Sequence, residues 1–418
     1  MQRESVLVIG GGVIGVCAAY YLAERGWPVH LVEQDDIAAG SSHGNAGLIV
    51  PSHIIPLPHP GVLTRGLKWL LDPESPLYIK PRLNLGLLAW LLRFGAACLE
   101  SRVQKAIPVL RDMGRASSEL YEQLAVLDGL DCGYQRTGLL TIFRNQRSFE
   151  DGIKEANVQA AHGVTAKVLD GAAVRQMEPT VRPEVVGGVF LPGDAHFTPD
   201  MFVRGLARLA ERHGLMIHPA TEVLGFEVSH RKVTTVRTTR GDFRPDQVVV
   251  AAGAWSPRLV RGLRLSLPIQ PAKGHSVTVK RPAVSPTIPL ALGESRVIVT
   301  PMTAPSGPVL RFAGTLELAG FDFSINRRRV NALTRAARTY LVGMEELETL
   351  EIWRGLRPCT PDDLPILGRP PGLANVILAT GHGMLGMSLG PITGKLVSQI
   401  ACGEKPDVDL KPLRVERF

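Results

Sequence analysis

The first thirty-three residues contain the pattern that most constrains how this chain can fold. A short apolar run at residues 6–10, VLVIG, leads directly into the glycine pattern Gly10-x-Gly12-x-x-Gly15. An apolar helical segment follows, and a second apolar run closes on Glu33. Gly10 permits a tight turn, Gly12 lets a pyrophosphate approach the backbone, and Gly15 lets the helix pack closely on the strand. Strand, glycine turn, helix, strand and acid in this order predict a dinucleotide-binding βαβ unit.

The same unit indicates how a dinucleotide would be held. The first helical residues, Val13 and Ile14, place free N–H groups and the positive end of the helix dipole at the phosphates. The Glu33 carboxylate can accept hydrogen bonds from ribose hydroxyls, and it would repel a 2′-phosphate. NADP is therefore disfavoured, whereas the βαβ unit alone leaves FAD and NAD open.

Composition narrows the class of protein. The chain has 418 residues, 45% of them apolar and 21% charged, which is typical of a folded protein of two joined domains. The net charge of +8 includes no long basic run, so no nucleic-acid partner is expected, and residues 327–329, RRR, are interpreted as solvated surface. Five scattered cysteines without a CxxC pair argue against a structural zinc or other metal site and fit a reducing cytoplasm. The sequence has no signal-peptide pattern, and no apolar run is long enough to span a bilayer.

The remaining pattern predicts a discontinuous cofactor domain. Residues 214–255 read as strands that return to the first sheet, with a β-meander between them, and residues 266–325 suggest an antiparallel sheet. Helices are expected over residues 83–99, 102–128 and 331–346; the first is expected to be buried or half-buried, with a membrane-surface helix as the alternative. We predict an α/β fold in which a cofactor-binding domain (1–60, 150–265 and 345–418) is interrupted by a substrate-binding domain (61–149 and 266–344) built on a mostly antiparallel sheet.

Three further segments favour a flavin over a nicotinamide. A run of small and hydroxyl residues after Glu33 can follow a ribityl chain and pyrophosphate, and Ala252-Gly253 ends a strand beside the dinucleotide crevice. A glycine loop before the last helix points N–H groups at the site where reduced flavin gains negative charge. A flavoenzyme needs this last strand–loop–helix as a wall for its isoalloxazine ring. The predicted loop contacts are Ser41, Ser42, Asn45, Ala46, Gly47 and Leu48 in the first segment and Gly381, His382, Gly383, Met384, Leu385, Gly386 and Met387 in the last.

Arg357 is the candidate for substrate binding. It lies in the segment 352–358, IWRGLRP, where an extended chain would put Trp353 and Arg357 on one face and Arg354 on the other. A planar guanidinium can bind a carboxylate through two hydrogen bonds. Structural pairing with Asp362 or Asp363 is the alternative. We expect His382 to order its loop rather than to act as a base.

These segments together resemble the D-amino-acid oxidase superfamily of FAD enzymes, and within it the FAD-bearing small subunit of bacterial D-amino-acid dehydrogenases. The resemblance is carried by GGGVIGVCAAYYLAERG, AGSSHGNAGLIVPS, DPESPLYIKPRLNLGLLAWLLRF, WRGLRPCTPDDLPILG and GHGMLGMSLGPITGK. It implies an FAD-binding Rossmann-like domain of the glutathione-reductase type, with Arg357 on the substrate carboxylate and Val223 over the adenine.

Two departures from the family pattern bear on chemistry. Relatives of the dimethylglycine type attach FAD through a histidine at the position of Gly44, whereas His43 lies one place early here, so the resemblance implies non-covalent FAD. The family's KGY segment reads Lys273-Gly274-His275, which would make the pocket more polar and favours a cyclic imino acid such as D-proline or D-hydroxyproline. His53 is a further candidate for the pocket wall.

The resemblance therefore implies an FAD-dependent dehydrogenase that oxidises a D-amino or cyclic imino acid by hydride transfer from the α carbon to flavin N5. Its electrons would pass to a quinone, a dye or an electron-transfer partner. The alternatives are a glycine- or sarcosine-type oxidase that uses oxygen, a flavin-bearing electron-transfer subunit of a hetero-oligomer, and an NAD-dependent dehydrogenase. We expect a cytoplasmic protein, with peripheral contact to the inner membrane as a further option.

Overall fold

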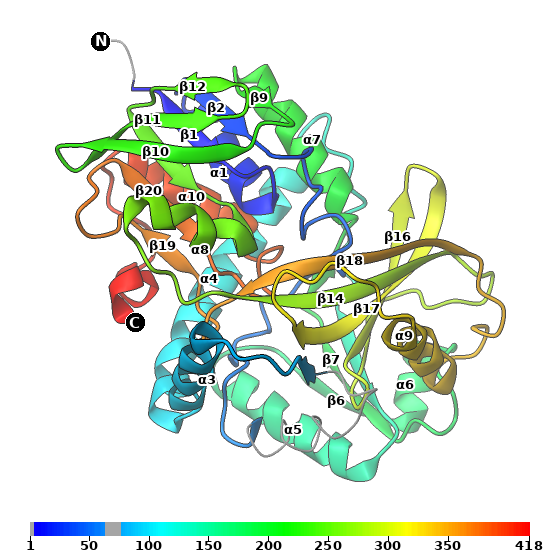
Figure 1. Ribbon diagram of the computed structural model, residues 1–418. Coiled ribbons are helices and arrows are strands. Elements are labelled where there is room, and N and C mark those ends of the chain that lie inside the picture. Colours follow the sequence, from blue (N-terminus) through cyan, green and yellow to red (C-terminus); the bar gives the residue numbers. More distant parts are fainter. Residues whose placement is uncertain (1–3, 63–76) are drawn as a thin grey trace.

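A largely parallel sheet contains the dinucleotide-binding pattern (Figure 1). The computed structural model describes residues 4–62 and 77–418. Within them this sheet has six strands in the order β19-β20-β13-β1-β2-β9, and only β19 runs antiparallel to its neighbour. The strands are β1 (Val6–Ile9), β2 (Val29–Val32), β9 (Met216–His218), β13 (Gln247–Val250), β19 (Ile366–Gly368) and β20 (Val376–Thr380).

The two faces of this sheet are covered differently because alternate side chains of a strand point to opposite sides. Val6 and Val8 of β1 pack among three helices, whereas Leu7 and Ile9 pack toward a three-stranded meander. The helices are α1 (Val13–Glu24), α7 (Pro199–Arg212) and α10 (Gly390–Ala401). The other face carries β10 (Val223–Ser229), β11 (Lys232–Thr238), β12 (Gly241–Phe243) and α8 (Ser256–Leu259). The predicted βαβ unit, the meander and the returning strands are confirmed.

The second large sheet is mostly antiparallel, as predicted for residues 266–325. Its strand order is β18-β14-β17-β16-β15-β5-β7-β6, with β4 added beside β17, and only the pairs β15–β5 and β17–β4 are parallel. Helix α5 (Gln146–Ala161) packs on one face, and α6 (Gly171–Met177) and α9 (Arg327–Tyr340) pack on the other. The strands are β4 (Leu77–Ile79), β5 (Leu139–Phe143), β6 (Lys167–Asp170), β7 (Gly187–Leu191), β14 (Gln270–Lys280), β15 (Leu290–Leu292), β16 (Val297–Ala304), β17 (Gly307–Leu318) and β18 (Thr349–Cys359).

Three sequence expectations need correction. Strands β6 and β7 pair in the second sheet, although residues 150–191 were expected with the cofactor domain, and β18 pairs with β14 there as well. Helix α9 begins at Arg327 rather than at residue 331, because the Asn326 side chain caps its first turn. Arg329 is therefore not solvated surface: it is 3% exposed and lies 2.9 Å from the Glu317 carboxylate.

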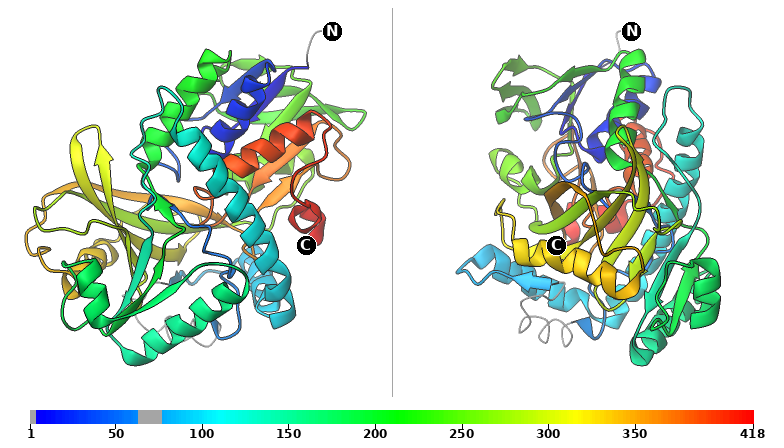
Figure 2. Two further views of the ribbon diagram at one scale, coloured as in Figure 1. Left: turned by 180° about the vertical axis from the view of Figure 1, so that it is seen from behind. Right: turned by 90° about the vertical axis from the view of Figure 1, so that its right-hand side faces the viewer.

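Two helices join the sheets along one side of the molecule (Figure 2). The longer, α4 (Glu100–Ala125), packs against α10 and α1, while α3 (Leu85–Ala97) lies at the periphery. β3 (Leu48–Ile49) and β8 (Ala195–His196) pair as a short antiparallel ribbon of their own. Among the described residues no helix is long and apolar enough to cross a membrane. Residues 72–76, the start of one motif that carried the family resemblance, lie outside the described residues.

Candidate active site

The glycine turn after β1 leaves no room for side chains. Gly10 has φ +116°, and a Cβ there would lie 2.6 Å from the Ala251 carbonyl oxygen. A Cβ on Gly15 would lie 1.9 Å from the Gly10 carbonyl oxygen, so α1 can pack on β1 only with glycine at this position. Gly12 forms the N-cap of α1 without a side-chain cap, and the first turn contains no acid. The helix N-terminus therefore remains suited to an anionic group.

Glu33 lies at the end of β2 beside this turn. Its Oε2 accepts a hydrogen bond from the Gly11 N–H at 2.6 Å, and its Oε1 accepts one from Asp35 N–H at 3.0 Å. Burial raises the pKa of this carboxyl above its usual range. Val223 begins β10 and is half-buried at the same end of the cavity.

A single large cavity of about 2070 Å³ connects Glu33 to the loop before α10. Ordinary small-molecule sites occupy about 300–1,000 Å³, so this cavity offers the length that a dinucleotide needs. With the exceptions of Gly15, Gly47 and Gly381, every residue proposed from the sequence borders it, namely Gly10, Gly12, Val13, Ile14, Glu33, Ser41, Ser42, Asn45, Ala46, Leu48, His53, Val223, Ala252, Gly253, His275, Arg357, His382, Gly383, Met384, Leu385, Gly386 and Met387.

The loop over residues 39–48 is held by contacts with α1 and with two strands of the second sheet, β17 and β18. Ser42 Oγ accepts a hydrogen bond from the Val13 N–H at 3.0 Å, and Ser41 Oγ donates to the Leu356 carbonyl. Arg311 of β17, which is only 5% exposed, donates to the carbonyl oxygens of His43 and Asn45. This loop therefore lies across the boundary between the two sheets, with its backbone fixed against the cavity.

Gly44 lies under an aromatic ring. A Cβ at Gly44 would fall 2.1 Å from the Trp353 side chain, and one at Gly355 would fall 2.0 Å from the same ring. Beside it, His43 Nε2 lies 2.8 Å from the Glu351 carboxylate, an ion pair that raises the pKa of His43. The indole therefore fills the space that a side chain at position 44 would need.

The loop before α10 closes the opposite end of the cavity. Gly381 and Gly383 have φ values of +77° and +54°, and the Gly383 N–H donates to the Pro358 carbonyl. His382 is 2% exposed, and its Nε2 bonds the Thr393 hydroxyl of α10 at 3.0 Å. Burial lowers the pKa of His382 to about 3, so the ring is neutral. It orders the loop and the helix, as the sequence suggested.

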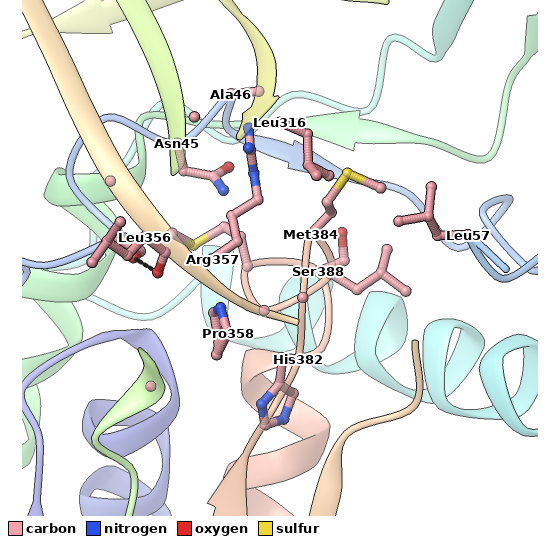
Figure 3. Close-up of a pocket in the computed structure, with 18 of the residues that line it drawn as sticks. Asn45, Ala46, Leu57, Leu316, Leu356, Arg357, Pro358, His382, Met384 and Ser388 are labelled. Atoms are coloured by element: carbon pink, nitrogen blue, oxygen red, sulfur yellow. Dashed lines mark hydrogen bonds between the residues drawn. The ribbon is translucent and has the colours of Figure 1, made fainter. Parts of the chain in front are cut away.

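Arg357 is half-buried, and its guanidinium lies against a glycine of the neighbouring strand. A Cβ on Gly274, in the neighbouring strand β14, would lie 2.2 Å from Arg357 Nη1 and 2.5 Å from Cζ. Nη1 donates to the Thr315 carbonyl of β17 at 2.8 Å. Figure 3 shows the guanidinium directed away from His382, toward Asn45 and Leu316.

No carboxylate pairs with Arg357 within residues 4–62 and 77–418. Asp362 pairs with Arg417 at 2.7 Å, and Asp363 Oδ2 accepts the Leu57 N–H at 2.8 Å. The structural pairing considered from the sequence is therefore absent for both acids. Burial alone lowers the pKa of Arg357, the only acidic influence on it being the Cys359 thiol. A half-buried cation that borders a cavity without a counterion is a site for an anionic ligand group.

The comparisons with known proteins agree with this geometry. The sequence profile of the family described as FAD dependent oxidoreductase matches residues 5–400. The chain belongs to this family of FAD-dependent oxidoreductases. It is 34% identical to a D-amino acid dehydrogenase of Paramagnetospirillum magneticum and 30% identical to one of Granulibacter bethesdensis, with 98–99% of each chain covered. A glycine oxidase from Geobacillus kaustophilus has a similar structure, with a TM-score of 0.81, 25% identity and full coverage of both chains.

Family membership decides between the two dinucleotides that the βαβ unit left open. The cofactor is FAD, and the cavity fits it. Gly10, Gly12 and the start of α1 suit the pyrophosphate, Glu33 suits the ribose, and the loops at residues 39–48 and 381–387 enclose the end nearest Arg357. The NAD-dependent alternative is therefore set aside.

One of the proposed substrate residues, His275, differs from expectation in its orientation. Gly274 faces the guanidinium, so the next side chain along β14, His275, turns to the opposite face of the sheet. There its Nδ1 lies 3.1 Å from the Thr315 hydroxyl and 3.4 Å from Glu317, and burial lowers its pKa to about 4. His275 therefore borders the cavity without directing its ring at the guanidinium, and the expectation that its side chain makes the pocket more polar is corrected. His53 borders the cavity, and its buried Nε2 has no hydrogen-bond partner among the described residues.

Arg311 and Gly274 were not predicted as site residues from the sequence. Arg311 occupies the middle of the run VLRFAG, and a charge in the middle of a buried strand is the signal that could have found it. Gly274 gives no comparable signal, since its role depends on which residue of β18 pairs beside it.

Proposed function

We propose that this flavoenzyme oxidises the Cα–N bond of a small amino or imino acid and that Arg357 binds the substrate carboxylate. The observation that carries the proposal is the half-buried Arg357 guanidinium without a carboxylate partner in the described chain, next to the loops proposed to bind the flavin. The similarity to D-amino acid dehydrogenases supports a D-amino acid, and the cyclic imino acids D-proline and D-hydroxyproline belong to the same chemical class.

The chain's contribution to such a reaction is mainly positioning. Nη1 of Arg357 is held by the Thr315 carbonyl, which leaves the remaining N–H groups to grip a carboxylate. FAD, when bound, supplies an acceptor for hydride at ring nitrogen N5. With the carboxylate fixed by Arg357, the Cα–H and the neutral amine of the substrate would be held in one orientation relative to the loops that enclose the cofactor. Neither His275 nor His382 is placed to act as a base, and this mechanism needs none.

We further propose that FAD is bound without a covalent link to this loop. Gly44 has no side chain to form one, and the Trp353 ring occupies the space beside it. The acceptor of the electrons is proposed to be a quinone or an electron-transfer partner, with a hetero-oligomer as one arrangement. All five cysteines are free, which fits the proposed reducing cytoplasm.

The two large sheets suggest how cofactor binding and substrate binding are divided between parts of the chain. We propose that the six-stranded sheet and its helices form the cofactor-binding domain, and that the nine-stranded sheet forms the substrate-binding domain. Residues 150–191 and β18 then belong to the second unit by their pairing.

The test is anaerobic mixing of the purified protein with D- and L-alanine, D- and L-proline, glycine, sarcosine and the matching amines without a carboxylate. We expect bleaching of the flavin by a carboxylated amine alone. R357A should lower kcat/KM by about 10²–10³-fold, since it removes one partner of a buried charged contact. R354A is the matched control, because Arg354 contacts the Phe323 carbonyl and ring instead.

An equal effect of R357A and R354A, or equal rates for substrates with and without the carboxylate, would refute the assignment. Under air, dye reduction without peroxide indicates a dehydrogenase, whereas stoichiometric peroxide indicates the oxidase alternative.

A further inference from the structure

The loop between β17 and α9, residues 319–326, reaches the side of the six-stranded sheet through aromatic rings. Trp255 ends the short 3₁₀ turn η1 (Gly253–Trp255), which follows β13. Its ring lies edge-on to Phe321, with ring centroids 5.7 Å apart, and stacks on Phe323 at 6.3 Å. Figure 1 shows this loop extending toward α8. We call the contact of these three rings the aromatic clasp.

Hydrogen bonds hold only one side of the clasp. On the side of the second sheet, the buried Lys273 ammonium donates to the Ser324 carbonyl at 2.9 Å. Toward η1 and α8, the contact consists of rings and of Arg258, whose guanidinium carbon lies 3.5 Å from the centre of the Phe321 ring. In the part of the chain that the structure describes, no hydrogen bond or ion pair joins this loop to residues 253–264. The rings can therefore separate without breaking a hydrogen bond.

The clasp joins two walls of the cofactor cavity. Trp255 and Arg258 border the cavity from the side of the six-stranded sheet, whereas Phe323 and Arg354 border it from the side of the second sheet. The Arg354 guanidinium lies over the Phe323 ring and donates to the Phe323 carbonyl at 3.0 Å. Phe323 is nevertheless 44% exposed, so this part of the clasp lies at the molecular surface. A movement of the loop away from η1 would open the cavity to solvent here.

We propose that the aromatic clasp is a gate through which FAD enters and leaves its cavity. The cavity extends from Glu33 to Arg357, so a dinucleotide that fills it lies between the walls that the clasp joins. Rings that must separate for entry and for release add to the barrier of both steps. Weakening their contact therefore speeds both steps and leaves the affinity for FAD nearly unchanged. A ring that only touches bound FAD would slow release alone.

The experiment follows flavin fluorescence as FAD binds to the apoprotein and as it leaves the diluted holoprotein. We expect F321A/F323A to raise the association rate and the dissociation rate each at least about tenfold, because two ring contacts are lost, while Kd changes by less than about threefold. I325A is the matched control and should leave both rates unchanged. Ile325 is 42% exposed in the same loop and takes part in none of the ring contacts.

W255A removes the same contact from the other wall. It should raise both rates by a similar factor, and its combination with F321A/F323A should be no faster than the faster parent, because the contact can be lost only once. Effects that multiply in the combined variant overturn the proposal. Unchanged rates also overturn it, as does faster release without faster binding, which indicates a fixed wall.

F321L/F323L keeps apolar side chains in the loop and should raise both rates by a smaller factor. An unchanged melting temperature of the apoprotein establishes that each variant is folded, and the leucine variant carries the test where the alanine variant is not. The readouts need FAD but no substrate, so a failure of the proposed function leaves this test intact.

Discussion

At the scale of single residues, the position of the Arg357 guanidinium depends on the absence of a side chain at Gly274. Arg357 reaches its position by lying across Gly274, where a Cβ would come within 2.2 Å of Nη1. Burial in a strand fixes the glycine backbone, so the guanidinium has to move if a methyl group is added. A displacement of about 1 Å in a substrate-positioning group can lower a rate about 10²-fold.

We therefore predict that G274A lowers kcat/KM for a carboxylated amine about 10²-fold while the protein keeps its bound FAD. G193A is the matched control, since a Cβ at Gly193 meets nothing within 4 Å. Steady-state kinetics and the flavin spectrum are measured on both variants. Full activity in G274A would mean that the position of the Arg357 guanidinium does not depend on a glycine at residue 274.

These residues also show what sequence reasoning can reach. Arg357 was identified because a charge in an apolar, proline-bounded strand is unusual in itself, and the structure places it at the cavity. The orientation of His275 was missed, because it follows from the register between β14, β17 and β18. Pairing between strands that are distant in the chain leaves no pattern in the local sequence from which the register could be predicted.

At the scale of elements, two buried carboxylates fasten the segment that contains His53. Asp194 accepts hydrogen bonds from the N–H and hydroxyl of Ser52, and Asp363 accepts one from the Leu57 N–H. Burial raises the pKa of each carboxyl to about 7. The folded protein therefore holds these protons between about pH 4 and pH 7, whereas the unfolded chain releases them. The associated stability is fully present below pH 4 and is lost as the pH rises through 7.

D194N removes this titration while keeping an acceptor for Ser52. We predict that the free energy of unfolding of D194N, relative to wild type, rises by roughly 2–4 kcal/mol as the pH increases from 4 to 8. Urea unfolding at several pH values measures it. D128N, at an exposed position, is the matched control. A constant difference for D194N would show that its carboxyl is ionised in the folded state throughout this range.

Elements with a strong internal pattern were predicted well, whereas the sheet to which β6, β7 and β18 belong was not. The βαβ unit, the meander and the last strand–loop–helix each contain their own period and turn residues. Strands β6 and β7 are short, and only the pairing of β7 with β5 and of β6 with β7 reveals that they belong to the second sheet.

At the scale of the whole molecule, one cavity takes its walls from both large sheets. The end near Glu33 is formed by β1, α1 and β2, whereas the end near Arg357 is formed by β14, β17 and β18. A ligand that fills the whole cavity must stabilise the elements at both of its ends. A ligand that fills only the end near Glu33 must stabilise the elements at that end alone. Ligand bound to the folded state alone adds about 2.7 kcal/mol of stability at a hundredfold excess over Kd.

We predict that FAD added to the apoprotein slows amide hydrogen exchange both in α1 and in β17 and β18, near Thr315 and Trp353. ADP, which corresponds to the nucleotide half alone, should slow exchange only around Gly10–Gly15 and Glu33, because its length ends before the second sheet. Exchange resolved by mass spectrometry on matched samples distinguishes the two patterns. The same protection from ADP as from FAD would mean that the isoalloxazine does not lie against the second sheet, and Arg357 would then be too far from the reacting atoms to orient a substrate.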